Sequence, residues 1–199
     1  MSRFIDSLSP MTLWLAFGVT AVLLVLLVAA LVIRRRRGKS ALGVLRTISY
    51  DLLNEIVVPK ADEGEIQIEY TLLTPSGILV VETKDVEGVV FASDRMDDWT
   101  VIAGNRRYTF ANPQPTLYDR VAAIAQIVKD VPVTGVILFP AAADFSKGRP
   151  RHVTTLDGLL EEFPRLGRSA DRSEIAAYLP HWERLRDEAV SASAARIID

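Results

Sequence analysis

The sequence predicts a mixed α/β domain that follows a single transmembrane helix. An uncharged apolar stretch occupies residues 11–33. Residues 65–84 then have the pattern of a β-hairpin, with two strand-forming runs on either side of a turn. Patterns typical of a helix, a strand and a second helix follow between residues 116 and 163. Hairpins followed by alternating helices and strands indicate a mixed sheet with helices packed on it.

The apolar stretch Met11–Ile33 has 23 residues, none of them charged. A helix of this length spans ~34 Å, enough to cross a bilayer core of ~30 Å. Arg34–Arg37 follow it directly, whereas a cleaved signal peptide has its positive charge before a shorter apolar core. We therefore expect an uncleaved anchor, and a buried helix of a soluble domain is the alternative. The positive-inside rule predicts a single-pass inner or plasma membrane protein, with its N-terminus outside and its domain in the cytoplasm.

Composition restricts the chemistry of the remaining chain. There is no cysteine, which excludes disulfides and thiolate metal sites. Beyond residue 37 the chain has 18 basic and 24 acidic residues, a formal charge of −6. This negative net charge is not typical of a protein that binds nucleic acid through a broad basic surface. The arginines after the apolar stretch are expected to set topology and to contact the anionic headgroups of the lipid bilayer.

The chain is expected to divide into five segments. They are a short extracytoplasmic N-terminus, a transmembrane anchor, a basic juxtamembrane linker, an α/β domain, and a C-terminal helix with a tail. Their respective ranges are 1–10, 11–33, 34–40, 41–165 and 166–199.

The first half of the α/β domain is expected to contain one helix and six strands. Apolar residues at helical spacing predict a helix from Ala41 to about Leu53, and Pro59 ends a short strand at Ile56–Val58. A hairpin is predicted over the turn Thr74–Gly77, where Pro and Gly suit a β-turn. Another strand and a second hairpin complete this half, at residues 88–91, 99–102 and 107–110.

The second half is expected to be mainly helical. Apolar spacing predicts a helix over Thr116–Lys129, and the wholly apolar Val133–Phe139 is typical of a strand buried on both faces. A basic loop over residues 141–151 leads to a short helix at 156–163. Asp171 with Glu174 three residues later predicts the start of a last helix, which runs to about residue 190.

The register of the first hairpin decides whether three charged residues, Glu69, Glu82 and Lys84, lie on the same face. If the hairpin closes symmetrically over its turn, Glu69 lies opposite Glu82, and Lys84 shares their face. Like charges directly opposite one another are destabilising unless a cation lies between them. A shift of one residue in register would move Glu69 to the other face and remove this expectation.

Several short motifs follow one another in a set order. They are Ile56–Pro59, Ile68–Tyr70, Pro75–Gly77, Val81–Lys84, Gly88, Trp99 and Asn112–Pro113. This order resembles that of the nuclease-related domain (NERD) family, within the PD-(D/E)xK nucleases, and the resemblance covers roughly residues 38–160.

The resemblance implies a restriction-endonuclease-like fold and metal-dependent hydrolysis of phosphodiesters in nucleic acid. It implies a Mg²⁺ site made by Glu69, Glu82 and the carbonyl of Thr83, which are hard oxygen ligands that suit this ion. Lys84 would position or activate the attacking water. The resemblance also implies that Asn112 and Gln114 lie near the site, as weaker candidates for substrate binding.

Four positions depart from the family's pattern. Glu69 stands where the family usually has Asp, and Tyr70 where it has His. Lys39 follows Gly38 where an acidic residue is common, and Thr116 stands where Gln is common. Two other interpretations therefore stay open. One is a catalytically degenerate domain that binds nucleic acid or a protein from its membrane tether, and the other is a tethered scaffold.

Each of these residues also has a structural interpretation. Glu82 and Lys84 could form a surface ion pair. Trp99 and Tyr108 could stack on bases, but core packing of a hairpin is the expected role. The basic residues of the loop, Lys147, Arg149 and Arg151, could contact phosphates or be solvated. Both histidines, His152 and His181, are expected to be structural, because neither has a metal-ligand spacing.

Overall fold

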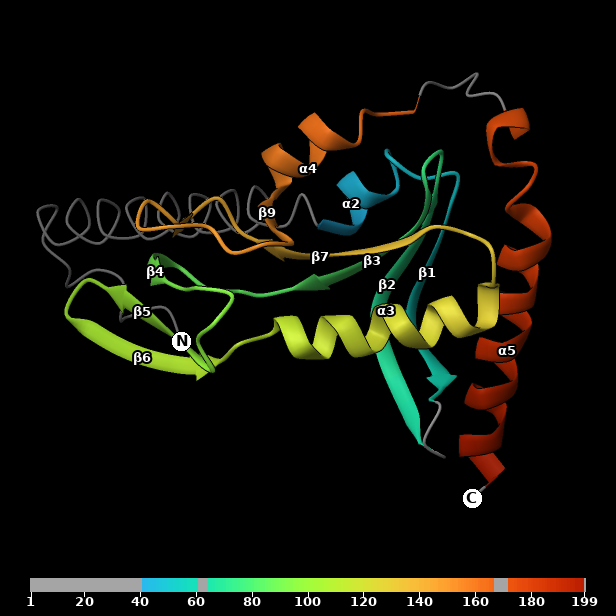
Figure 1. Ribbon diagram of the computed structural model, residues 1–199, viewed down its shortest axis with the longest axis horizontal. Coiled ribbons are helices and arrows are strands. Elements are labelled where there is room, and N and C mark those ends of the chain that lie inside the picture. Colours follow the sequence, from blue (N-terminus) through green and yellow to red (C-terminus); the bar gives the residue numbers. More distant parts are fainter. Residues whose placement is uncertain (1–40, 61–63, 167–171, 199) are drawn as a thin grey trace, which may run out of the picture. The chain divides into compact units, whose positions relative to one another are not determined.

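Two mixed β-sheets form the centre of the structure (Figure 1), a computed structural model that describes residues 41–60, 64–166 and 172–198. Residues from Val44 to Asp199 form a compact unit, and the sheets belong to it. The first sheet has the strand order β1-β2-β3-β7-β9 and the second has the order β6-β5-β4-β8. In the first sheet β1, β2 and β3 are antiparallel, while β7 pairs in parallel with both β3 and β9.

The strands and helices have the following bounds. The strands are β1 Asp51–Pro59, β2 Glu65–Thr74, β3 Gly77–Thr83, β4 Gly88–Phe91, β5 Asp98–Ala103, β6 Arg106–Ala111, β7 Val133–Phe139, β8 Ala143–Asp144 and β9 Val153–Thr155. The helices are α2 Ala41–Leu45, α3 Gln114–Val128, α4 Leu156–Glu162, the 3₁₀ helix η1 Arg172–Ile175, and α5 Leu179–Ile198. Both predicted hairpins, the strand after the first hairpin, the apolar strand β7 and helices α3 and α4 are confirmed.

The prediction of a helix from residue 41 to about 53 was wrong beyond Leu45. Helix α2 ends there, and the hydroxyls of Thr47 and Ser49 donate to carbonyls of the preceding turn, at 2.7 and 2.8 Å. Such side-chain bonds compete with helical ones. Leu52, one of the apolar residues that suggested the helix, instead lies in β1 opposite Leu72 of β2.

The last helix differs from the prediction at both ends. Its predicted first residue, Asp171, lies outside the described residues. Helix α5 begins at Leu179 with Pro180 in its first turn, a position that tolerates a residue without an N–H, and it extends to Ile198.

The predicted membrane anchor and basic linker, residues 11–40, lie outside the described part of the chain. Among the helices that the structure does describe, none is long and apolar enough to cross a membrane.

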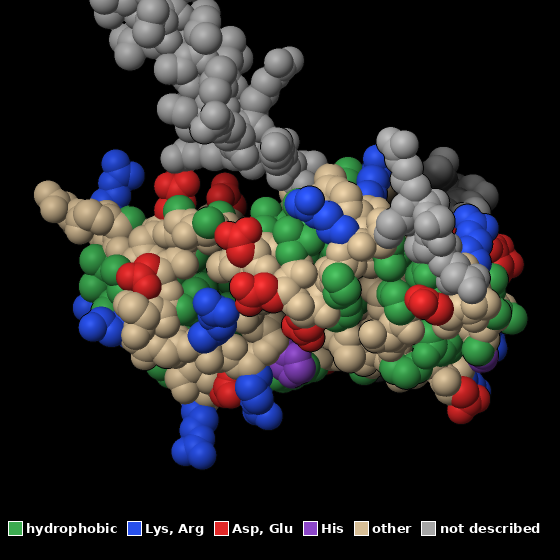
Figure 2. Space-filling view, turned by 90° about the horizontal axis from the view of Figure 1, so that it is seen from above, with side chains coloured by type: hydrophobic (Ala, Val, Ile, Leu, Met, Phe, Trp, Pro, Cys, Tyr) green, Lys and Arg blue, Asp and Glu red, His purple; other side chains and the backbone are tan. Residues whose placement is uncertain are grey.

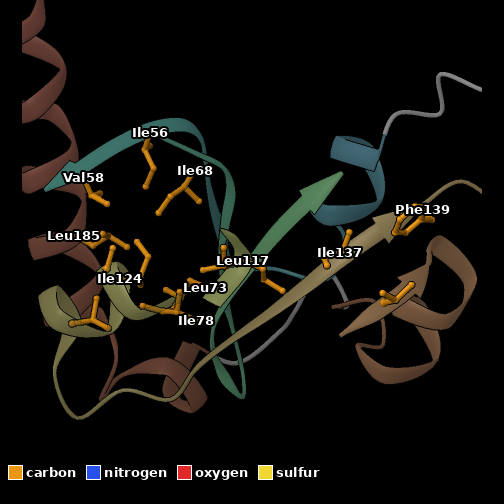
Figure 3. Packing of buried hydrophobic residues seen from close by; sticks show 14 of the residues in the cluster. Ile56, Val58, Ile68, Leu73, Ile78, Leu117, Ile124, Ile137, Phe139 and Leu185 are labelled. Carbon is orange, nitrogen blue, oxygen red and sulfur yellow. The ribbon is translucent and has the colours of Figure 1, made fainter. Parts of the chain in front are cut away.

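Much of the hydrophobic core lies between one face of the first sheet and the helices α3 and α5 (Figure 3), and the same cluster continues to buried residues of the second sheet, such as Trp99 and Val101. Ile68 of β2, Ile124 of α3 and Leu185 of α5 are wholly buried in it. Gly135 of β7 permits the close approach of α3, because a Cβ at this position would lie 2.6 Å from Val121 of that helix. The side chains of α3 are therefore held at a defined place over the sheet.

A kink in β1 changes which residues of this strand face the core. Glu55 has a φ of +52°, and the pairing of β1 with β2 skips this residue although the register is the same on both sides of it. Before the kink Leu53 packs against the core, and after it Ile56 does. On a regular strand, residues an odd number of positions apart point to opposite faces. Leu53 and Ile56 are three positions apart and both contact the core, so the side-chain alternation of β1 is reversed at the kink.

Candidate functional site at the β2–β3 fork

The pairing between β2 and β3 stops before the strands end. It starts at Thr74↔Gly77, in the register that the sequence predicts, and its last pair is Tyr70↔Val81. Beyond this pair β2 stays with β1, whereas β3 continues beside β7. Figure 1 shows β1 and β2 running on past α3 while β3 leads toward the second sheet. We call the opening beyond Tyr70↔Val81 the β2–β3 fork; it is flanked by residues 67–69 of β2 and 82–84 at the end of β3.

Glu82 is the central charged residue of the fork. Its side chain is 8% exposed, and Lys84 Nζ lies 2.6 Å from its Oε1. Arg120 of α3 donates from Nη1 to the other oxygen, Oε2. The Arg120 Nε also donates to the main-chain carbonyl of Gln67 on β2, at 2.8 Å. Arg120 therefore joins the two strands across the fork.

Glu69 binds the other strand through Thr83. Its two oxygens accept from the Thr83 backbone N–H at 2.7 Å and from the Thr83 hydroxyl at 2.6 Å. A regular ladder would give the Thr83 N–H a main-chain acceptor on β2. The Glu69 carboxylate supplies that acceptor instead, because the ladder has already ended.

The two carboxylates of the fork have different partners on different sides of β3. Neighbouring side chains on a strand point to opposite faces, so the Thr83 hydroxyl and the Glu82 carboxylate lie on opposite sides of β3. The hydroxyl holds Glu69, whereas Glu82 faces α3 with Lys84. The expected single patch of two carboxylates and an ammonium is therefore divided into two pairs. The reason is that the strands separate one residue before the predicted Glu69–Glu82 opposition.

This arrangement does not fit a Mg²⁺ ion. All four carboxylate oxygens of Glu69 and Glu82 already accept from N–H or O–H groups. In residues 41–60, 64–166 and 172–198, no three His, Cys, Asp or Glu side chains gather closely enough to hold a metal ion. Metal ligation by Glu69, Glu82 and the Thr83 carbonyl remains a prediction that would need these partners to move.

Two residues near the fork, Arg120 and Glu55, were not predicted from the sequence. Arg120 lies three residues after Leu117 and beside the apolar stripe of its helix, a spacing that indicates proximity to the sheet but no particular partner. Glu55 is a strand residue in a left-handed conformation, for which the sequence offers no signal. Burial first, and then the charges of Glu69 and Glu55, raise the pKa of the Tyr70 phenol. The fork is thus acidic on the side of β1 and β2.

The predicted substrate contacts Asn112 and Gln114 belong to a different network. Gln114 is 2% exposed, and its Nε2 donates to Asp94 Oδ1 at 2.8 Å and to the Arg151 carbonyl at 2.9 Å. The Asn112 amide donates to the Met96 carbonyl and to Gln114 Oε1. None of these partners flanks the β2–β3 fork. The network ties the loop before β5 and the loop before β9 to the start of α3.

Asp94 is the acceptor at the centre of this network. It receives the Gln114 amide, and the backbone N–H and Nε of Arg151 each donate to it at 2.9 Å. The Gln114 hydrogen bond is the largest cause of the lowered pKa of the Asp94 carboxyl, followed by the backbone hydrogen bond from Arg151. Arg151, one of the three loop cations considered for phosphate binding, is therefore ion-paired with Asp94.

The aromatic residues considered for base stacking have opposite environments. Trp99 is wholly buried, with ring centroids 6.0 Å from Phe110 and 6.3 Å from Phe139, so its core role is confirmed. Core packing was the wrong expectation for Tyr108, which lies on the edge strand β6 and is 42% exposed. His152 Nδ1 lies 3.1 Å from the Gly135 carbonyl, which agrees with a structural role.

Comparison with known proteins identifies the family of this fold and site. The profile of the nuclease-related domain matches residues 35–140. The chain belongs to the nuclease-related domain (NERD) family. The match includes the β2–β3 fork and Arg120, while β9, α4 and α5 follow it. The mixed α/β architecture with two mixed sheets fits a nuclease-like fold, and membership is consistent with the restriction-endonuclease-like superfamily.

An uncharacterized protein of Bacillus anthracis is 29% identical to this nuclease-related domain protein over 91 residues. The match covers 46% of this chain and 43% of that protein, so the chain spans less than half of its relative's length. No solved structure matches the chain.

Proposed function

We propose that this nuclease-related domain protein binds nucleic acid from a tether on the cytoplasmic membrane without hydrolysing it. The observation that carries the proposal is the pairing of Glu82 with Lys84 and Arg120. Hydrolysis in this family's pattern would require the carboxylate for a metal and the lysine for water. Here Lys84 and Arg120 both pair with Glu82, and the second carboxylate, Glu69, is bound to Thr83.

The edge strand β6 supports nucleic acid as the partner. Arg106, Arg107 and Tyr108 are exposed on it, next to the turn that closes the second hairpin. Arginine contacts phosphates and a tyrosine ring stacks on bases, a combination typical of single-strand binding. On the face in Figure 2, acidic and basic side chains are interspersed. A local contact at β6 therefore fits the charge distribution better than a broad basic surface.

The membrane tether rests on the sequence of residues 11–37. An uncharged stretch of 23 residues followed by four arginines supports a single-pass anchor with the domain on the cytoplasmic side. The partners of the protein would then be the lipid bilayer and a nucleic acid that comes near it.

A second candidate function is Mg²⁺-dependent hydrolysis of phosphodiesters. It is favoured by the direct contact of Lys84 Nζ with Glu82 Oε1 at 2.6 Å, which brings together the two side chains of the family's E-x-K motif. This function requires Glu82 to leave Arg120, so that Glu69, Glu82 and the Thr83 carbonyl could ligate the ion.

Binding and cleavage by the full-length protein in detergent micelles separate these candidates. Fluorescence anisotropy with labelled single- and double-stranded DNA and RNA in EDTA is expected to show binding. The double substitution Arg107→Gln/Tyr108→Ala should weaken it, and Mg²⁺ should yield no product. Absence of binding to every oligonucleotide would overturn the proposal and direct the search to a protein partner. Mg²⁺-dependent cleavage that is lost in both Glu82→Gln and Lys84→Ala would establish the second candidate.

A further inference from the structure

The guanidinium of Arg120 has the ligand environment of a bridging cation. Its Nη1 donates to the carboxylate of Glu82 on β3 and its Nε to the main-chain carbonyl of Gln67 on β2. A carboxylate and a peptide carbonyl are also the oxygen ligands that a hard divalent ion takes. One side chain thus makes, from a helix, the type of contacts that the family's pattern assigns to a metal.

Arg120 is held in place by the packing of its helix. Leu117 and Ile124, three residues before and four residues after it, are wholly buried in the core between α3 and the first sheet. Gly135 brings α3 close to β7, the strand that pairs with β3 beside Glu82. The packing of α3 therefore places the Arg120 guanidinium beside Glu82 at the fork.

The charges of the fork leave no excess negative charge for an added cation. The Glu82 carboxylate faces two cations, Lys84 and Arg120, in hydrogen-bonded pairs, whereas Glu69 is held by Thr83 on the other side of β3. The Glu82 side chain is 8% exposed and that of Arg120 is 20% exposed, so solvent screens their attraction much less than at an open surface. A divalent ion would enter against Arg120 and Lys84 and would have to displace at least one of them.

We propose that Arg120 takes the place of the divalent cation and thereby closes the Glu82 site to metal ions. The inference deepens the proposed function, on which it rests, because it names the residue that keeps this nuclease-related site without a metal. Removing the guanidinium leaves Glu82 with one cation, Lys84, and lowers the net charge of the Glu82–Lys84–Arg120 group from +1 to zero. The same carboxylate then becomes a ligand for a divalent ion.

Mn²⁺ binding to the full-length protein in detergent micelles tests this proposal, with free Mn²⁺ measured by electron paramagnetic resonance. Arg120→Gln is expected to bind Mn²⁺ about tenfold or more tightly than wild type, since a repulsive unit charge is removed from the site. Adding Glu82→Gln to Arg120→Gln should return binding to the wild-type level. Arg120→Lys, which keeps the charge, should bind no better than wild type.

The matched control is Lys129→Gln, which removes an exposed cation next to the end of the same helix. It should leave Mn²⁺ binding unchanged. Equal binding by wild type and Arg120→Gln would overturn the proposal, as would retained binding in the double variant. Near-ultraviolet circular dichroism checks the fold around Trp99 and Trp182. If Arg120→Gln does not fold, Arg120→Met, which keeps much of the apolar stem, provides the same comparison.

Nucleic-acid anisotropy on the same preparations distinguishes this inference from the proposed function. If Arg120→Gln gains Mn²⁺ binding while wild type binds no oligonucleotide, only the proposed function fails. If wild type binds oligonucleotides and Arg120→Gln gains no Mn²⁺ binding, only the role of Arg120 fails.

Discussion

The Glu69 carboxylate accepts from both donors of Thr83, the backbone N–H at 2.7 Å and the hydroxyl at 2.6 Å. These bonds lie just beyond the last β2–β3 pair, where main-chain pairing has stopped. A side chain predicted to ligate a metal thus replaces a missing ladder bond. Its structural role is separable from any role in chemistry.

Substitution of Glu69 should therefore destabilise the fold. Glu69→Ala leaves the Thr83 N–H without its acceptor and is expected to lower the free energy of unfolding by about 1–3 kcal/mol. Thr83→Val, which removes the hydroxyl bond alone, should cost about 1 kcal/mol. Urea denaturation measures both. The control is Gln67→Ala, an exposed side chain on the same strand, and an equal loss in that variant would contradict the role of Glu69.

The Glu82–Arg120 pair should show strong energetic coupling. Arg120→Ala leaves a carboxylate that is 8% exposed with only Lys84, and it is expected to cost about 3 kcal/mol. Once Glu82 is Leu, the same Arg120→Ala substitution should cost much less, because no buried charge loses its partner. A double-mutant cycle by urea denaturation measures the coupling, and additive losses would contradict it.

Gln114 should matter for stability because its side-chain amide is buried with three hydrogen-bond partners. Gln114→Ala leaves these groups unsatisfied, and we expect a loss of about 1–3 kcal/mol in the free energy of unfolding. Gln126→Ala, an exposed glutamine on the same helix, should change the free energy of unfolding by less than about 0.5 kcal/mol. Thermal or urea denaturation of both variants is the measurement. Equal effects would show that the network does not hold the start of α3.

The same network should produce a pH dependence at Asp94. The Gln114 amide, then Arg151, holds the pKa of the Asp94 carboxyl below its ordinary value of 3.8. A lowered pKa in the folded state contributes stability above the unfolded-state pKa, and this contribution is lost as the pH falls through the folded-state value. The stability advantage of wild type over Asp94→Asn should therefore be constant above about pH 5 and shrink below about pH 4. Urea denaturation at several pH values checks this, and an advantage that persists at pH 2 would contradict it.

Sequence reasoning worked where a local pattern determines the structure. The turn Thr74–Gly77 and the apolar residues around it specify the hairpin and its register, because a slip of one residue would turn buried side chains toward solvent. The contact of Glu82 with Lys84 follows from their spacing of two on one strand.

The rest of the site depends on contacts between distant segments. Arg120 meets Glu82 across 38 positions of sequence, and no local pattern specifies that pairing. Tyr108 is exposed on β6, the edge strand of its sheet, and that position is a property of topology. The kink at Glu55 lies in a third strand, outside the hairpin, so the hairpin's own sequence could not reveal it.

That kink leads to a last prediction, at Glu55 itself. Its φ of +52° lies in the left-handed region, which glycine adopts without strain and β-branched residues strongly disfavour. Glu55→Val should therefore lower the free energy of unfolding by about 1–3 kcal/mol relative to Glu55→Gly. In an ordinary strand the order is reversed, because valine is the better strand former. Urea denaturation of the two variants decides between these orders.

The control for this comparison is the same pair of substitutions at Gln67, an exposed residue of regular β2. There valine should be the more stable of the two. If valine is also the more stable at Glu55, the strand is regular at that position, and the change of core-facing residues between Leu53 and Ile56 needs another cause. If the orders are opposite, Glu55 holds the left-handed conformation in the folded protein, and this kink accounts for the change of core-facing residues along β1.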